Sequence, residues 1–148
     1  MRISIKKLIL ILSVLLLAVS CNREETDATT TNPSATSGFT WRENDPNGAV
    51  KTAATSELRT QYKSIFAFDS SNATLFEINL TGTAPATYDL ATSGNAFYFK
   101  DMATGGAITG KVIITSNSGG KASGTFEAFT SGTGITRVYG TFKDIIVK

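Results

Sequence analysis

Downstream of residue 37, the sequence is a series of short runs in which apolar and polar residues alternate. The clearest run is Phe76-Glu77-Ile78-Asn79-Leu80, where every second side chain is apolar. Alternation with a period of two is typical of a β-strand with one buried and one solvated face, because successive side chains point to opposite sides of a sheet. No run in this part of the sequence sustains the period of a helix. The pattern therefore predicts a fold built from strands.

Turn-forming residues separate these runs at short intervals, and 11 of the 13 glycines lie after residue 80. Gly94-Asn95 predicts a tight hairpin between strands at 88–90 and 97–99. Residues 52–62, in contrast, are expected to be irregular or to form a single helical turn. Many short strands with frequent turns predict an all-β domain over residues 38–148. Its expected architecture is an antiparallel β-sandwich or a partly closed barrel of about eight or nine short strands.

Two segments near the end of the chain share the motif Gly-Thr-Phe, the first starting at Gly124 and the second at Gly140. The repetition predicts paired strands in which a glycine sits where another backbone or ring comes close. The last strand, from about Arg137 to Val147, ends in Ile145-Ile146-Val147. This end is apolar on both faces, which favours a position inside a closed or partly closed sheet.

Charge and cysteine content narrow the range of functions. Three of the 14 basic residues (Arg2, Lys6 and Lys7) precede the first apolar run, which leaves 11 basic against 12 acidic side chains in the rest. Because this part of the chain has almost no net charge, we expect no nucleic-acid partner. The single cysteine, Cys21, cannot form a disulfide within the chain, so packing and hydrogen bonds must hold the fold.

The first 20 residues have the layout of an export signal. A positive start is followed by an apolar run from Leu8 to Val19, interrupted only by Ser13. This run is shorter than the roughly 20 residues that a spanning helix needs. Small residues then lead directly to Cys21. We therefore expect a lipoprotein signal peptide at 1–20, cleaved between Ser20 and Cys21.

The residues at the cleavage point, Ala18-Val19-Ser20-Cys21, resemble a relaxed lipobox of the kind common in Bacteroidota. The strict pattern has Leu at the position of Ala18 and Gly or Ala at that of Ser20. The resemblance implies a diacylglycerol on the Cys21 sulfur and a fatty acid such as palmitate on the new amine. The alternative is an ordinary signal peptide with an incidental cysteine. Two or three acyl chains would make the anchor permanent.

Residues 21–37 predict a lipidated, disordered tether, because no large apolar side chain follows Cys21 in this stretch. Within it, Asn22-Arg23-Glu24-Glu25 resembles the signal that sends Bacteroidota lipoproteins to the outer leaflet of the outer membrane. The alternative is a solvated charge run. The expected location is the outer membrane, with a lipid anchor and exposure at the cell surface, and no cofactor beyond the covalent lipid on Cys21.

A wider set of strand and turn segments follows the lipobox and the Thr-rich tether: Phe39-Thr40-Trp41, Tyr62-Lys63-Ser64-Ile65, Phe76-Glu77-Ile78-Asn79-Leu80, Gly94-Asn95-Ala96 and the closing Gly140-Thr141-Phe142-Lys143-Asp144-Ile145. Together they resemble a family of small lipoproteins of flavobacteria and related Bacteroidota, a domain of unknown function. The resemblance covers most of residues 38–148. It implies a β-rich lipoprotein domain in the cell envelope and transfers no activity and no functional residue.

Much enzyme chemistry is excluded by composition. The chain has no histidine, and its one thiol is assigned to the lipid, so no catalytic triad, cysteine nucleophile or zinc site is expected. A pair of carboxylates could still hydrolyse a glycosidic bond. A solvated sheet face is the better interpretation of Glu77 and Glu127. The candidate carboxylates are Asp69, Glu77, Asp89, Asp101 and Glu127.

Aromatic side chains could instead form a platform for a sugar. The candidates are Trp41, Tyr62, Tyr88, Tyr98 and Tyr139. Trp41 shares a face with Phe39, which predicts a core position. Tyr98 and Tyr139 fall opposite apolar faces and are the candidate ligand-binding aromatics.

We therefore expect a non-catalytic surface lipoprotein, a binding or accessory module for another envelope protein or a glycan. The alternative is a carboxylate-dependent surface hydrolase acting on glycans.

The lipid anchor gives a direct prediction. Mass spectrometry of the mature amino terminus should find a thioether-linked diacylglycerol on Cys21, because the lipobox directs that modification. Cys21→Ser should release the protein from the membrane fraction. An unmodified thiol on a protein free in the medium would contradict the expectation.

Overall fold

The computed structural model describes residues 37–148, and all its regular elements are strands, as predicted. The expected signal peptide, the Ser20–Cys21 cleavage site, the lipid on Cys21 and all but the last residue of the tether lie outside this range. Within the described residues there is no helix with the length and apolar character to cross a membrane. The strands are β1 (Gly38–Glu43), β2 (Lys51–Thr52), β3 (Thr55–Arg59), β4 (Ser64–Phe68), β5 (Thr74–Asn79), β6 (Ala86–Asp89), β7 (Ala96–Phe99), β8 (Thr109–Ser118), β9 (Lys121–Phe129) and β10 (Arg137–Val147).

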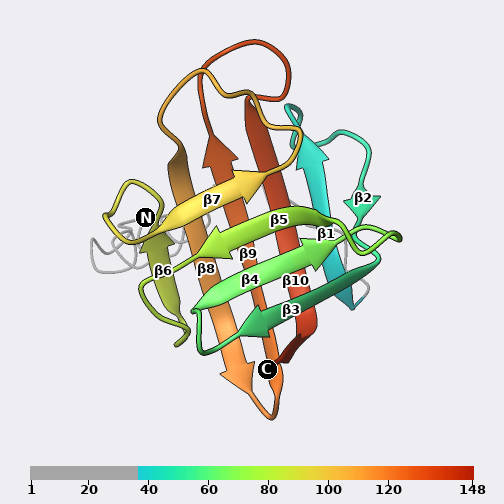
Figure 1. The fold of residues 1–148 in the computed structure, drawn as a ribbon, viewed down its shortest axis with the longest axis vertical. Coiled ribbons are helices and arrows are strands. Elements are labelled where there is room, and N and C mark those ends of the chain that lie inside the picture. The colour runs from blue at the N-terminus through green and yellow to red at the C-terminus, as the bar shows by residue number, and fades with distance from the viewer. Residues whose placement is uncertain (1–36) are drawn as a thin grey trace, which may run out of the picture. The chain divides into compact units, whose positions relative to one another are not determined.

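The ten strands form one sheet that curls into a partly closed barrel with two layers. The main path of the sheet is β6-β8-β9-β10-β3-β4-β5-β7, and β1 pairs with both β10 and β2. In Figure 1, strands β3, β4, β5 and β7 form one layer, and they cross strands β8, β9 and β10 of the other layer at a steep angle. This arrangement confirms the predicted fold class, with one difference. The sheet is mixed, because β10 and β3 run parallel.

One bulge lets β10 belong to both layers. Over residues 138–143, β10 pairs with β1 along one edge, whereas Ile146 and Val147 pair with β3. The pairing with β9 shifts between Phe142 and Ile145, and Asp144 in between has a left-handed φ of 53°. Strands commonly change layers at bulges of this kind, because the extra residue bends the chain and increases its twist. The end of β10 therefore lies between two strands, although Ile146 is 58% exposed and the predicted burial of both faces is wrong.

Two local expectations are corrected. Strands β6 and β7 do not form a hairpin, since β6 pairs with β8 and β7 pairs with β5. The side chain of Asn95 ties loops together instead, accepting from Thr81 N at 2.7 Å and donating to Asp89 O at 2.7 Å. Residues 52–62 contain strand β3, which is held by parallel pairing with β10 and antiparallel pairing with β4.

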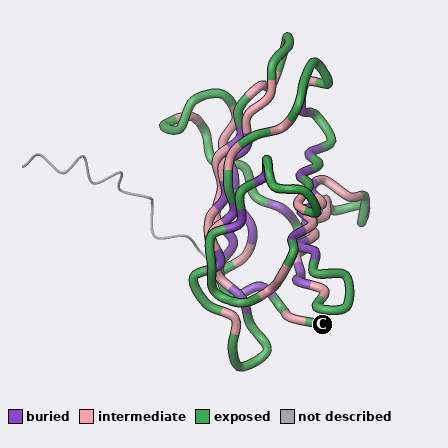
Figure 2. The backbone as a smooth tube through the Cα atoms, turned by 90° about the vertical axis from the view of Figure 1, so that its left-hand side faces the viewer, coloured by how far each residue is buried: buried purple, intermediate pink, exposed green. Residues whose placement is uncertain are grey.

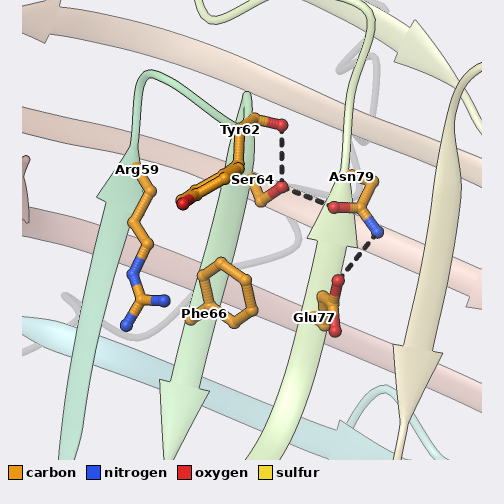
Figure 3. A pocket seen from close by; sticks show the side chains of 6 residues that line it. All are labelled: Arg59, Tyr62, Ser64, Phe66, Glu77 and Asn79. Carbon is orange, nitrogen blue, oxygen red and sulfur yellow. Dashed lines mark hydrogen bonds between the residues drawn. The ribbon is translucent and has the colours of Figure 1, made fainter.

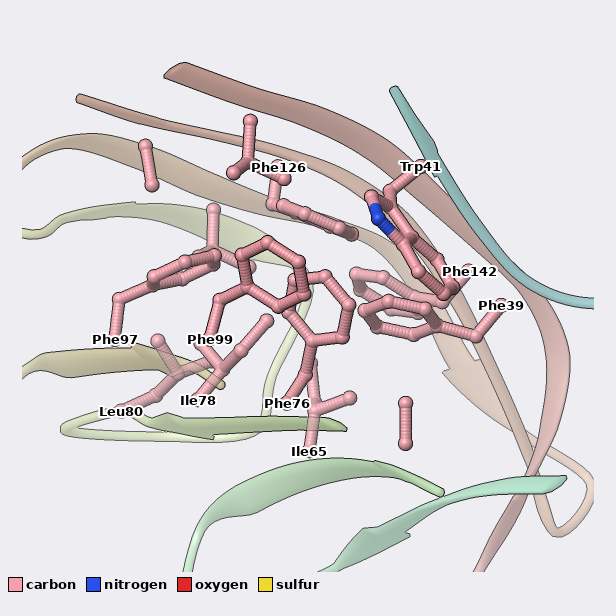
Figure 4. Close-up of a cluster of buried hydrophobic side chains, with 14 of the residues drawn as sticks. Phe39, Trp41, Ile65, Phe76, Ile78, Leu80, Phe97, Phe99, Phe126 and Phe142 are labelled. Atoms are coloured by element: carbon pink, nitrogen blue, oxygen red, sulfur yellow. The ribbon is translucent and has the colours of Figure 1, made fainter. Parts of the chain in front are cut away.

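Aromatic rings fill the space between the two layers. Phe76 lies at the centre, with its ring centroid 4.4 Å from that of Phe99, 4.9 Å from Phe39 and 5.0 Å from Trp41 (Figure 4). Trp41 is 6% exposed, which confirms its predicted place in the core. Figure 2 shows that the buried positions follow the strands, whereas the connecting loops are largely exposed. Tight aromatic packing therefore holds the layers together.

The Gly-Thr-Phe segments pair as predicted, and each glycine lies opposite the phenylalanine of the other segment. Gly140 pairs with Phe126, and Gly124 with Phe142. A Cβ atom on Gly140 would lie 2.1 Å from the Phe126 ring and 2.6 Å from the Thr40 carbonyl oxygen. Each ring thus occupies the space that a side chain on the facing strand would need.

Replacing Gly140 by Ala should therefore destabilise the fold. An added methyl group must displace the Phe126 ring and the β1 backbone, which costs about 1–3 kcal/mol or more by the usual penalty for overpacking. Urea denaturation measures the change. Lys143→Ala, at an exposed position of the same strand, should stay within about 0.5 kcal/mol of the native chain. Unchanged stability of Gly140→Ala would refute the close approach.

Candidate functional site

The outer face of β3, β4, β5 and β7 carries an alternating row of acidic and aromatic side chains. In register across the four strands, Glu57 lies opposite Phe66, Phe66 opposite Glu77, and Glu77 opposite Tyr98. Side chains directly opposite each other in an antiparallel pair have Cβ atoms about 4.5–5.5 Å apart, so neighbours in the row are in contact range. This row, together with the residues of the pocket described next, is called the aromatic face.

A pocket opens on the aromatic face, mainly above β4 and β5. Its volume is about 380 Å³, within the usual range of ligand pockets. Figure 3 shows its side chains rising from adjacent strands on one side of the sheet. The lining residues are Arg59, Tyr62, Ser64, Phe66, Glu77 and Asn79. The pocket thus combines aromatic rings with a guanidinium, a carboxylate, an amide and a hydroxyl group.

The turn between β3 and β4 positions Tyr62 at the rim of the pocket. Lys63 adopts a left-handed φ of 53°, and its N–H donates to Thr60 O at 3.2 Å. The Lys63 carbonyl oxygen accepts from Leu80 N at 3.0 Å, which fixes the turn against the end of β5. Tyr62 itself is 62% exposed. A large, exposed ring on a fixed turn is available for stacking by a ligand.

On the β3 side of the pocket, two cationic side chains form ion pairs with a single carboxylate. The Glu57 carboxylate forms ion pairs with both Arg59 and Lys148. The hydrogen bond from Lys148 is the largest influence on Glu57 and, together with Arg59, it holds the pKa of this carboxyl group below its ordinary value against the opposing effect of burial. The Arg59 guanidinium also lies 4.5 Å from the centroid of the Phe66 ring, a cation–π contact.

The β5 side of the pocket is negative. Glu77 accepts a hydrogen bond from Asn79 Nδ2 at 3.1 Å, and the Asn79 Oδ1 atom lies against the Ser64 hydroxyl group, which is also 2.9 Å from the Tyr62 carbonyl oxygen (Figure 3). Of the four glutamates in residues 37–148, the other three are in ion pairs: Glu43, Glu57 and Glu127. Glu77 is the one with no ion-pair partner among the described residues.

The structure does not bring the two predicted aromatics together. Tyr98 is 52% exposed and lies on the aromatic face beside Glu77. Tyr139 lies on β10, in the other layer, where it is partly buried and packs edge-on against Phe129 with centroids 5.8 Å apart. Of the other candidates, Tyr88 is buried and donates its hydroxyl proton to Ala84 O at 2.8 Å, whereas Tyr62 lines the pocket.

Among the candidate carboxylates, only Glu77 lines the pocket. Asp69 and Asp89 accept backbone hydrogen bonds from the residues of their own turns. Glu127 faces Lys111 across β8 and β9, with a closest N···O distance of 3.3 Å. No group of three or more potential ligands for a metal ion occurs within residues 37–148.

The sequence patterns did not point to four of the six lining residues: Arg59, Ser64, Phe66 and Asn79. One signal was present: Ile65-Phe66-Ala67-Phe68 is apolar at every position. Ile65 and Ala67 fill the core, so Phe66 and Phe68 must lie on the outer face, where both are only partly buried. An apolar run in an alternating sequence thus marks an outer face with aromatic character.

Comparison with protein-family models, with curated proteins and with solved structures gave no match. The resemblance to flavobacterial lipoproteins therefore stays a prediction, and the site is interpreted from its own geometry.

The ion pairs of Glu57 with Arg59 and Lys148 predict that the stability of the fold depends on pH. Because the folded-state pKa of Glu57 is lowered, its contribution is complete above the ordinary carboxyl pKa and is lost as the pH falls through the folded value. Glu57→Gln should lower the free energy of unfolding at neutral pH by on the order of 1 kcal/mol. The difference between the two chains should shrink in acid. Urea denaturation at neutral and at acidic pH measures the difference in the free energy of unfolding between the native chain and the variant. A difference that grows in acid would contradict the assignment.

Proposed function

We propose that this chain is a lipid-anchored, non-catalytic binding protein of the bacterial outer membrane that recognises a glycan on its aromatic face. The observation that carries the proposal is the composition of the pocket, where Tyr62 offers an exposed ring beside Arg59, Glu77 and Asn79. A sugar ring presents an apolar face of C–H groups and a rim of hydroxyl groups. Aromatic rings suit the first, and charged or amide groups that donate and accept hydrogen bonds suit the second.

The proposed location at the outer membrane is based on the sequence, and it suits a protein that binds glycans. A lipid on Cys21 and the tether of residues 21–37 would hold the domain at a membrane surface, where extracellular or envelope glycans are found. Docking to another envelope protein remains the other form of the accessory role, and capture of a protein instead of a glycan would favour it.

A carboxylate-dependent hydrolase is the alternative from a different class. Such an enzyme needs one carboxyl group with a raised pKa to act as the proton donor. On the aromatic face, Glu57 is ion-paired with two cations and its pKa is lowered, so it stays ionised at neutral pH. Glu57 is therefore not suited to be the proton donor of such an enzyme.

The proposal predicts that Tyr62→Ala and Tyr98→Ala each weaken glycan binding. Losing one stacking ring costs about 1 kcal/mol, so the affinity should fall roughly five- to tenfold. A glycan array identifies the ligands, and calorimetry on the strongest one measures the dissociation constants.

Tyr139→Ala is the matched control, because this tyrosine lies in the other layer. It should bind as the native chain does. Circular dichroism confirms that each variant is folded. Absence of any glycan binding, or equal losses in all three variants, would overturn the proposed function, and turnover of a bound glycan would favour the hydrolase.

A further inference from the structure

We infer that the ligand of the aromatic face carries a protonated amino group, which binds at the Glu77 carboxylate between the rings of Phe66 and Tyr98. The inference rests on the proposed function and deepens it: the ligand class is a glycan that contains amino sugars with free amines. Its basis is the place of Glu77 in the row, its lack of an ion-pair partner, and the aromatic rings on both sides.

The aromatic neighbours of Glu77 are set by strand register. Phe66 lies directly opposite on β4, and Tyr98 lies directly opposite on β7. The face of an aromatic ring carries negative charge density and attracts a cation within about 6 Å of its centroid. Register therefore places Glu77 between two aromatic side chains, and a ring face turned toward the carboxylate adds to its attraction for a positive charge.

Charge pairing elsewhere on the face leaves this position to an external cation. Arg59 is engaged by Glu57 and stacks on Phe66 from the β3 side, and Lys148 is also bound to Glu57. Neither cation forms an ion pair with Glu77. The same arrangement of acid and ring, Glu57 beside Phe66, thus already holds a cation from within the chain. Glu77 likewise lies beside aromatic side chains, Phe66 and Tyr98, but none of the described residues supplies a cation to it.

The Glu77 carboxylate is also held in place before a ligand arrives. Asn79 donates to it at 3.1 Å, and Asn79 is itself fixed against the buried Ser64. The strand that carries both residues is anchored from below by Phe76 and Ile78, which are fully buried. A fixed acceptor loses little freedom on binding, which favours a charge-assisted hydrogen bond to an ammonium group.

Two oligosaccharides that differ only in the amine test the inference. The cationic probe is a glucosamine hexamer, and the neutral probe is the N-acetylglucosamine hexamer of the same linkage. Binding of both probes is measured at mildly acidic pH, where the amines of the glucosamine hexamer are protonated. We expect the cationic hexamer to bind about five- to tenfold more tightly than the neutral one, with a preference that weakens as salt is added.

Glu77→Gln keeps the shape of the side chain and removes its charge. It should abolish the preference for the cationic hexamer, because both hexamers then meet the same uncharged side chain. Glu127→Gln makes the same chemical change on β9, in the other layer, and should leave the preference intact. Circular dichroism and urea denaturation confirm that both variants are folded.

The outcomes separate this inference from the proposed function. Equal binding of the two hexamers, or a preference that survives Glu77→Gln, overturns the inference. If neither hexamer binds while other glycans bind the aromatic face, the inference also fails and the proposed function stands. If no glycan binds but a tetralysine peptide does so in a Glu77-dependent manner, both fail, because the cation then belongs to a protein.

Discussion

The two layers of this domain are joined through one strand that changes its neighbour. Left-handed Asp144 bends β10, so that its residues before the bulge pair with β1 and its last residues pair with β3. Only two register pairs make the parallel junction. The burial of aromatic rings between the layers must therefore provide most of the cohesion, since hydrophobic burial is the dominant favourable term in folding. The orientation of the β3-β4-β5-β7 layer, and with it the aromatic face, depends on this junction.

The core and the pocket lie on opposite faces of the same strands. On β5, Phe76 and Ile78 pack inward, while Glu77 and Asn79 point outward into the pocket. Strand β4 departs from this alternation, because its outward residues Phe66 and Phe68 are aromatic. Their rings stack nearly parallel, 6.0 Å apart, and the guanidinium of Arg59 lies over both. An exposed apolar surface of this kind is often a binding surface.

The sequence was sufficient to predict the fold class, the buried Trp41 and the pairing of the two Gly-Thr-Phe segments, because each depends on a short pattern. Strand partners that depend on distant contacts could not be predicted. Gly94-Asn95 has the composition of a hairpin turn, yet the strands on either side of it join different layers. Strand β3 is rich in polar residues and forms because β10 and β4 pair with it. The pocket was missed for the same reason, since its residues come from three strands and a turn that meet only in the folded chain.

The buried rings beneath the pocket have a consequence for recognition. Because Ile65, Phe76 and Ile78 have no exposed surface, the strands that form the pocket floor have little freedom to rearrange. Among the rings of the aromatic face, Tyr62 and Tyr98 are the most exposed, and each has two rotatable side-chain bonds that become ordered on contact with a ligand. Much of the entropy cost of ordering the binding site is thus met during folding, so binding itself has to offset mainly the ordering of the two tyrosines and the lost translational and rotational freedom of the ligand.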